Sequence, residues 1–204
     1  MTMEWATRGP EPFVMADTSD LIQFLESRFD KQIKAHHVIE PEPGHFSEYP
    51  AALDPRLRSV LEGQKIPSLY AHQGEAFDAI TRGEDTVLVS RTASGKTLSF
   101  LLPILNEYIK ADAPFGVMLL YPTKALSRDQ ESTLGKLLHA SMDNRKLGTF
   151  DGDTPAEERR NIQRQADFVI TNPDMLHAGI LPNHNRGWKS FLSRLPYIVV
   201  DEVH

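Results

Sequence analysis

From Thr86 to the end of the chain, short apolar runs rich in β-branched residues alternate with longer segments of helical hydrophobic period. This alternation predicts βαβ units and a parallel sheet covered by helices on both faces, that is, an α/β fold. The 204 residues give room for one full α/β domain, or for a domain of roughly 140 residues with a lead-in segment. The expected strands are 86–90, 116–121, 146–150, 167–171 and 197–201, and the expected helices are 96–109, 125–141, 155–165, 173–178 and 188–195.

The first 65 residues have a different pattern, and we place a boundary near Gln64 between a small N-terminal extension, 1–65, and a more regularly patterned domain, 66–204. Residues 17–29 predict an amphipathic helix that Asp17, Thr18 or Ser19 can cap. A strand could follow at 32–39, and the proline-rich stretch 40–55 predicts an ordered loop or linker.

Composition excludes several classes of protein. The chain has no cysteine, which excludes disulfide scaffolds, thiolate zinc sites and iron-sulfur clusters, and its net charge of −6 gives no support to non-specific nucleic-acid binding. No apolar run approaches the roughly 18 to 20 residues that a membrane helix needs, and residues 1–8 lack a secretory signal pattern. We therefore expect a cytoplasmic protein with no membrane partner.

The sharpest local feature is the stretch 90–97, Ser-Arg-Thr-Ala-Ser-Gly-Lys-Thr, between an apolar strand pattern and a helix pattern. In this setting a loop of small residues can point backbone amides at a phosphate, with Lys96 reaching the β and γ phosphates and the Thr97 hydroxyl binding Mg²⁺. The alternative is a surface turn that caps a helix. The predicted ligands are therefore a nucleoside triphosphate and Mg²⁺, and the residues expected to bind the nucleotide here are Thr92, Ala93, Ser94, Gly95, Lys96 and Thr97.

A second feature is the apolar run 196–200, which ends in Asp201 and Glu202. Strand ends face the ligand in open α/β sheets, so Asp201 is expected to bind Mg²⁺ and Glu202 to orient and deprotonate the attacking water. Adjacent acids at a strand end can also be a solvated turn. Lys96, Asp201 and Glu202 are the predicted catalytic residues, with Thr97 and Asp201 as metal ligands.

Asp201-Glu202-Val203-His204 resembles the DExH motif of superfamily 2 helicases, and residues 69–204 are similar to their first RecA-like domain in motif order. The resemblance is closer to the RecQ-four-like group, which includes bacterial mitomycin-repair helicases, and it implies an ATP-dependent helicase acting on DNA. Leu69 to Gln73 looks like the Q motif, in which Gln73 would pair with the adenine edge. Ser90 departs mildly from the family, which often has alanine there.

Three further turns resemble motifs that contact nucleic acid in this family. Each follows a strand pattern and offers hydroxyls, free amides or a cation, groups that bind phosphates and sugars without reading bases. Each could equally be an ordinary turn or helix cap. The expected contacts with single-stranded or partly duplex nucleic acid are Pro122, Thr123, Lys124, Gly152, Thr171, Asn172, Pro173 and Asp174.

Some residues favour a structural role. Residues 157–160, Glu-Glu-Arg-Arg, are expected to form a solvated helix face, although Arg159 or Arg160 could touch nucleic acid. Trp188 is expected to be a packing residue.

In the family that this chain resembles, the motif that corresponds to Asp201 and Glu202 is followed by a motif III strand. A second RecA-like domain, which supplies an arginine finger, comes after it. The resemblance therefore implies that this chain is an N-terminal fragment, incomplete at the C-terminal side of its sheet and inactive by itself. Two alternatives stay open. One is a non-catalytic nucleotide-binding, nucleic-acid-binding or partner-docking module, and the other is an ATPase that translocates without unwinding.

Overall fold

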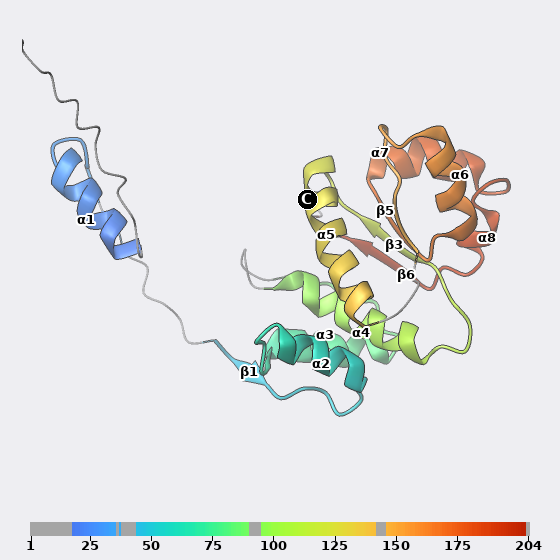
Figure 1. Cartoon of the computed structure of the whole chain (residues 1–204), viewed down its shortest axis with the longest axis horizontal. Helices are drawn as coiled ribbons and strands as arrows, with labels where there is room; N and C mark the ends of the chain where they lie inside the picture. Colours follow the sequence, from blue (N-terminus) through green and yellow to red (C-terminus); the bar gives the residue numbers. More distant parts are fainter. Residues whose placement is uncertain (1–17, 36, 38–43, 90–94, 142–145, 203–204) are drawn as a thin grey trace, which may run out of the picture. The chain divides into compact units, whose positions relative to one another are not determined.

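The computed structural model describes residues 18–35, 37, 44–89, 95–141 and 146–202, and it divides into two compact units, Met1–Pro43 and Gly44–His204 (Figure 1). The described part of the first unit contains helix α1, Thr18–Phe29, as predicted, and none of its side chains is buried. The strand expected at 32–39 is not formed at the described positions, since residues 33–35 and 37 have no regular structure. Residues 36, 38 and 39 lie outside the described part.

The second unit contains a four-stranded parallel sheet, which confirms the predicted α/β class. Its strands are β4 (Leu147–Thr149), β5 (Phe168–Thr171), β3 (Val117–Leu120) and β6 (Tyr197–Val200), in the order β4-β5-β3-β6. These are four of the five strands expected from the apolar runs. Strand β3 pairs with β5 on one side and β6 on the other, with Leu119 opposite both Ile170 and Val199. The carboxyl ends of all four strands therefore lie at one edge of the sheet.

The fifth expected strand, 86–90, was a wrong prediction at its described positions. Residues 84–89 have no regular structure, and the side chains of Val87 and Val89 are 88% and 92% exposed. A strand needs a neighbour about 4.8 Å away to satisfy its backbone. Here a cavity of about 940 Å³ separates this segment from β6. No described strand pairs with the outer edge of β6, so the apolar run lacks the hydrogen-bond partner that would make it a strand.

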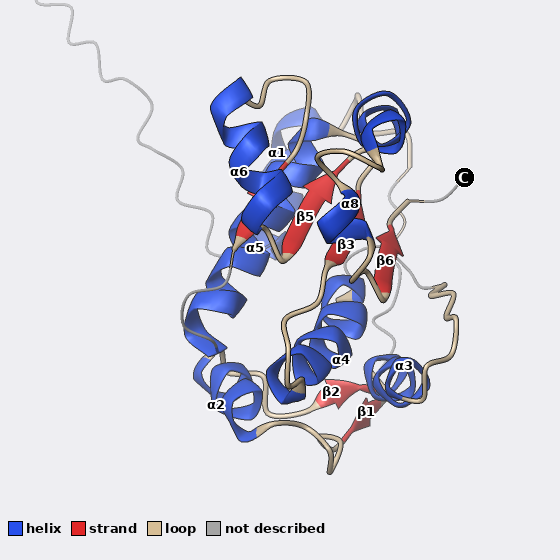
Figure 2. Cartoon of the chain, turned by 90° about the vertical axis from the view of Figure 1, so that its right-hand side faces the viewer, coloured by secondary structure: helices blue, strands red, loops and turns tan. Residues whose placement is uncertain are grey.

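Helices cover the sheet as the alternating pattern predicted (Figure 2). In α5 (Lys124–Ser141) and α6 (Ala156–Gln165) the observed ends lie within one residue of the expected ones. Pro155 occupies the N-cap position of α6, and the Thr154 hydroxyl forms its hydrogen bond inside the preceding loop. The elements of this set are α4 (Lys96–Lys110), α5 (Lys124–Ser141), α6 (Ala156–Gln165), α7 (Pro173–Met175), the π-helix η1 (Leu176–Ile180), the 3₁₀-helix η2 (Leu181–Asn183) and α8 (Lys189–Leu192).

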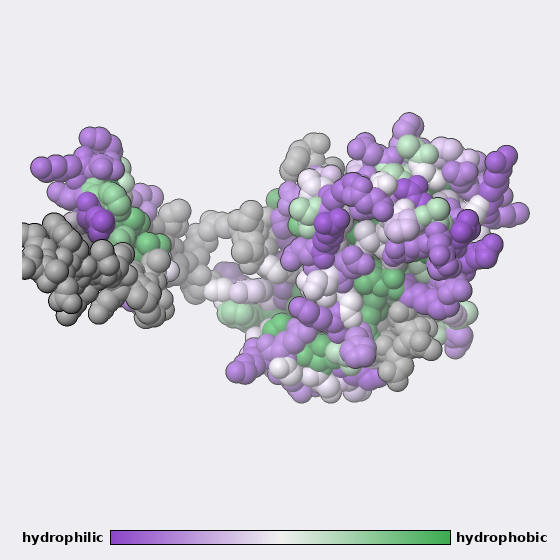
Figure 3. Space-filling view, turned by 45° about the horizontal axis from the view of Figure 1, so that its top comes forward, coloured by the Kyte–Doolittle hydropathy of each residue, from purple (hydrophilic) through white to green (hydrophobic). Residues whose placement is uncertain are grey.

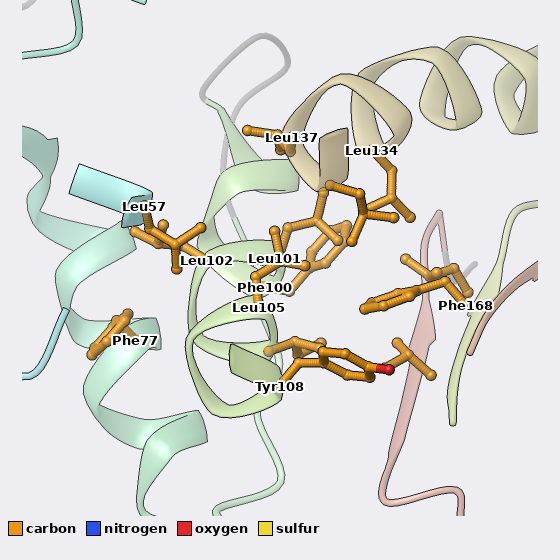
Figure 4. Close-up of a cluster of buried hydrophobic side chains, with 14 of the residues drawn as sticks. Leu57, Phe77, Phe100, Leu101, Leu102, Leu105, Tyr108, Leu134, Leu137 and Phe168 are labelled. Carbon is orange, nitrogen blue, oxygen red and sulfur yellow. The ribbon is translucent and has the colours of Figure 1, made fainter. Parts of the chain in front are cut away.

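Two hydrophobic clusters fill the space on either side of the sheet. Because side chains alternate along a strand, Val117 and Leu119 join the larger cluster, whereas Met118 and Leu120 join the smaller one. The larger cluster packs α4 and α5 against the sheet, with Leu101, Leu105 and Leu134 among its members (Figure 4). In the smaller one Trp188 is fully buried, with its ring centroid 4.8 Å from that of Phe150, which confirms its packing role.

Four elements were not expected: β1 (Phe46–Ser47), α2 (Pro55–Gly63), β2 (Leu69–Tyr70) and α3 (Ala71–Thr81). The Asp54 side chain caps α2 and Pro55 occupies its first turn. This helix-start signal was overlooked when 40–55 was predicted to be a loop or linker. Leu57 and Leu61, one turn apart, are both 1% exposed in the larger cluster. The division into compact units falls between Pro43 and Gly44, so the expected boundary near Gln64 lies within the second unit. The reason is that α2 completes the core of the second unit.

The face of the second unit that Figure 3 shows is mostly polar, with patches of hydrophobic residues. Within the described part of the chain, no helix is both long and apolar enough to cross a membrane.

Candidate nucleotide site and nucleic-acid turns

The N-terminus of α4 carries the predicted phosphate-binding residues that the structure describes. Gly95 is the N-cap and has a φ of 74°, in the left-handed region that favours glycine. Lys96 and Thr97 follow in the first turn, both half-buried, at the partially positive end of a 15-residue helix. Ser90, Thr92, Ala93 and Ser94 lie outside the described residues.

Gln73 connects this turn to the Q-motif segment. Its Nε2 donates a hydrogen bond to the Gly95 carbonyl at 3.0 Å, and its Oε1 accepts one from the Tyr70 amide at 2.9 Å. The residue is 4% exposed, and a Cβ at Gly95 would stand only 2.6 Å from Nε2. Only glycine therefore allows this contact. Adenine pairing by Gln73 stays a prediction, since its amide here supports the N-terminus of α4.

The two predicted acids directly follow β6. The Asp201 amide donates to the Leu120 carbonyl of β3 at 3.0 Å, and the Glu202 amide donates to Asp201 Oδ1 at 3.1 Å. Glu202 has a φ of 55°, a conformation that costs a non-glycine residue free energy and is concentrated at functional sites. Nearby, burial raises the pKa of the Tyr121 phenol, and the negative charge of Asp201 raises it further.

Lys96, Asp201 and Glu202 line one cavity, the same cavity of about 940 Å³ that lies beside β6. Two distant stretches of sequence, the start of α4 and the end of β6, thereby present an ammonium group and two carboxylates to a common space. Its remaining lining comes mainly from the segment 83–89, from α4 and from the whole of β6, so its volume does not measure the nucleotide site. Thr97 is not among the lining residues.

An exposed aromatic stack lies beside Gln73 and was not predicted. The rings of Phe46 and Tyr70 are stacked with centroids 4.9 Å apart, and Tyr70 stacks on His72 at 5.6 Å. Phe46 is 60% exposed. The sequence signal was Tyr70 and His72 within the Q-motif segment, but Phe46 joins them only through the β1–β2 pairing, which sequence reasoning did not find.

The turn after β3 contains Pro122, Thr123 and Lys124, all exposed. The Thr123 hydroxyl accepts a hydrogen bond from the Leu126 amide at 3.3 Å, so this residue also caps α5. Lys124 Nζ forms an ion pair with Asp153 Oδ2 at 2.7 Å. Because Asp153 follows β4, this pair joins two of the three predicted turns.

Gly152 lies at the tip of the loop after β4, and Lys124 Nζ is 3.6 Å from the position that a Cβ on this glycine would take. The turn after β5 is tied to the same loop, since the buried Thr171 hydroxyl donates to the Phe150 carbonyl at 2.7 Å. Asn172 caps α7 through the Met175 amide at 2.9 Å. Pro173 and Asp174 are exposed in the first turn of α7.

The structure thus brings the three turns together at the carboxyl edge of the sheet. It also assigns capping or loop-supporting bonds to Thr123, Thr171 and Asn172, as the turn-and-cap alternative expected.

A parallel sheet with an ammonium group at a helix start and paired acids at a strand end is typical of nucleotide-binding domains of the P-loop type. The DEAD/DEAH box helicase family matches residues 70–204, and the chain belongs to that family. This confirms the resemblance to a first RecA-like domain of superfamily 2 helicases.

Several relatives support the family in more detail. The chain is 42% identical over 168 residues to the uncharacterized ATP-dependent helicase YprA of Bacillus subtilis, covering 82% of this chain and 22% of the relative. It is 34% identical to the ATP-dependent helicase HRQ1 of Saccharomyces cerevisiae, covering 94% of this chain and 18% of the relative. A crystal structure of the DUF1998 helicase MrfA bound to DNA and AMPPNP matches with a TM-score of 0.75 at 40% identity, covering 79% of this chain and 22% of that one. The chain thus spans about a fifth of the length of these relatives.

Proposed function

We propose that this chain is the ATP-binding domain of an ATP-dependent DNA helicase, which couples hydrolysis to translocation and strand separation. The observation that carries the proposal is the common cavity lined by Lys96, Asp201 and Glu202. A triphosphate requires positive charge at its β and γ phosphates, and its hydrolysis requires an oriented water, which are the two needs that these groups meet. DNA as the substrate is supported by the relative MrfA, whose structure contains DNA and AMPPNP.

The residues present fit a nucleotide with Mg²⁺. In the proposed site Lys96 binds the β and γ phosphates, and the free amides at the start of α4 add partial positive charge. Asp201, which lines the cavity, would supply a hard oxygen ligand of the kind that Mg²⁺ prefers, and the Thr97 hydroxyl, next to Lys96 but not part of the cavity lining, is the proposed second ligand. The metal would neutralise charge on the phosphates. Glu202 orients the attacking water and accepts its proton.

Adenine would lie on the other side of α4's first turn, beside Gln73 and the Phe46–Tyr70 stack. A purine base gains stacking energy on an exposed aromatic ring. Pairing with the base would require Gln73 to exchange its bond to the Gly95 carbonyl for one to adenine. Base binding and the conformation of the phosphate turn would then be linked through one side chain.

Nucleic acid is proposed to bind along the turns after β3, β4 and β5. Lys124 is the cation of this surface, and Gly152 leaves room for the close approach of a sugar-phosphate backbone. Backbone contacts of this kind are independent of base sequence. Pro122, Thr123, Thr171, Asn172, Pro173 and Asp174 complete the proposed surface.

The test uses Lys96→Ala, with Lys136→Ala, an exposed lysine on α5, as the matched control. In the chain itself, titration with a fluorescent ATP analogue should show loss of binding only for Lys96→Ala. In a complete protein carrying the same change, ATP-driven strand separation should be lost. Strand separation that persists in that variant would refute the role of Lys96, whereas DNA binding without any ATP dependence in the unaltered protein would favour the non-catalytic alternative.

A further inference from the structure

Arg159 does not belong to the solvated helix face that the sequence predicted for 157–160. It is half-buried near the start of α6, whereas its neighbour Arg160 is exposed. Its guanidinium lies 5.3 Å from the ring centroid of buried Phe150. From there it turns back over the loop that joins β4 to α6.

The Arg159 guanidinium binds three carbonyls of that loop. Its Nε donates to the Thr154 carbonyl at 2.7 Å. Its Nη2 donates to the carbonyls of Asp151 at 2.9 Å and Gly152 at 3.1 Å. Three acceptors on one rigid planar group fix the peptide orientations of the loop, which a lysine ammonium could not reproduce.

The amides of the loop are bound from the inside. Asp151 Oδ1 accepts from the Asp153 amide at 2.8 Å and from the Thr154 amide at 3.0 Å. The Thr154 hydroxyl accepts from the Asp151 amide at 2.8 Å and donates to the Thr149 carbonyl at 2.9 Å. The loop therefore has a carboxylate on its amides and a guanidinium on its carbonyls, so removing Arg159 leaves one half of this arrangement without a donor.

This loop is also the junction of the three proposed nucleic-acid turns. Asp153 forms the ion pair with Lys124 of the β3 turn, and the Phe150 carbonyl accepts from Thr171 of the β5 turn. A change in the loop would displace Gly152 and alter how Lys124 is held.

We propose that Arg159 is a positioning residue for nucleic-acid binding. It sets the conformation of 151–154 so that Gly152 and Lys124 present one continuous surface to a nucleic-acid backbone. The inference rests on the proposed function. The competing interpretation is direct contact between Arg159 and a phosphate, but two of its three nitrogens are already bound to the loop.

The experiment compares Arg159→Gln, Arg159→Lys and, as the matched control, Arg160→Gln, which removes the same charge from the same helix. Fluorescence anisotropy with a labelled single-stranded oligothymidylate measures affinity over a range of salt concentrations. We expect both Arg159 variants to bind about five- to thirtyfold more weakly, because they lose hydrogen bonds that shape the loop. The slope of log affinity against log salt concentration should stay unchanged, because no phosphate contact is lost. Arg160→Gln should stay within about twofold of the unaltered chain.

Two results would overturn the positioning role. One is unaltered affinity in Arg159→Gln. The other is near-normal affinity in Arg159→Lys together with a slope reduced by about 0.7 in Arg159→Gln, as for the loss of one phosphate contact. If the unaltered chain itself fails to bind the oligonucleotide, the proposed nucleic-acid function fails instead.

Amide hydrogen exchange of Asp153 and Thr154 without nucleic acid gives an independent measure. Both amides should exchange faster in the two Arg159 variants and not in Arg160→Gln. Unchanged exchange would show that the loop keeps its conformation without Arg159, against the inference.

Discussion

Replacing Gly95 by alanine tests how the start of α4 is built. The backbone there has a φ of 74°, and a left-handed conformation costs an alanine about 1–2 kcal/mol. The added Cβ would also lie 2.6 Å from Gln73 Nε2, so the amide must move and lose its bond to the Gly95 carbonyl. A lost hydrogen bond costs about another 1 kcal/mol, and a buried amide group left without a partner costs somewhat more. We expect Gly95→Ala to lower the free energy of unfolding by about 2–4 kcal/mol.

Gly83 supplies the matched control, because it has a φ of 78° and no atom within 4 Å of the position of an added Cβ. Gly83→Ala should therefore show the backbone cost alone, about 1–2 kcal/mol. Urea unfolding followed by circular dichroism measures both values. The difference between them, about 1–2 kcal/mol, isolates the contact with Gln73.

A double-mutant cycle then tests the cause. In a Gln73→Ala background the obstructing amide is gone, so Gly95→Ala should cost no more than Gly83→Ala does in the unaltered chain. If Gly95→Ala costs the same with and without Gln73, the close contact does not exist in solution, and the link between the Q-motif segment and the phosphate turn is refuted.

Two further results are expected. Deleting residues 1–43 should leave the urea midpoint of the second unit unchanged, whereas deleting residues 1–65 should lower it sharply, because it removes the buried leucines of α2, each worth about 1.5–3 kcal/mol. Burial raises the pKa of Tyr121 above its usual 10.0, so the stability that this phenol contributes is present below pH 10 and decreases as the pH rises above it. Tyr121→Phe should therefore flatten the alkaline limb of a stability–pH curve, and an unchanged limb would refute the assignment.

The apolar runs predicted most strands of the sheet because a strand buried on both faces needs apolar residues along its length. Strands β3 and β5 are buried on both faces between two clusters, so their sequences are continuous apolar runs that are easy to recognise. The run at 86–90 is also apolar, but its described residues, 86–89, have no hydrogen-bond partner among the described strands. Composition indicates that a segment can be a strand, but pairing decides whether it becomes one, and pairing is not local in sequence.

The N-terminal part of the second unit was harder to predict because a contact that holds it is distant in sequence. The prolines of 40–55 suggested a linker, yet Pro55 begins a helix because the Asp54 side chain accepts a hydrogen bond from the Arg56 amide at 2.9 Å. The Asp54 amide in turn donates to Oδ1 of Asn106 in α4, 52 residues away, at 2.8 Å. A contact at such separation has no signature in the local pattern.

The residues of the candidate site likewise fall into those that a local sequence pattern predicts and those that it does not. Lys96, Asp201 and Glu202 follow from local patterns, a small-residue turn before a helix and acids after an apolar run. The bonds from Gln73 to Gly95 and from Arg159 to the β4 loop do not, since glutamine and arginine at such positions usually face solvent. Sequence thus identified the groups proposed for chemistry, whereas only the structure identified the groups that hold them in place.

The order of the strands has a consequence for how the two proposed ligands would influence each other. Strand β3 lies between β5 and β6, and its end contacts both neighbours: the Tyr121 amide donates to the Thr171 carbonyl at 2.9 Å, while the Leu120 carbonyl accepts from the Asp201 amide at 3.0 Å. Asp201, proposed to bind Mg²⁺, and Thr171, whose hydroxyl supports the nucleic-acid loop, are therefore each joined by one backbone hydrogen bond to adjacent residues, Leu120 at the end of β3 and Tyr121 directly after it. A displacement of the β3 end on nucleotide binding would move both turns, because strands in a packed sheet do not slide independently. Coupling between the nucleotide and nucleic-acid surfaces would then require no long pathway, only the rigidity of one strand end.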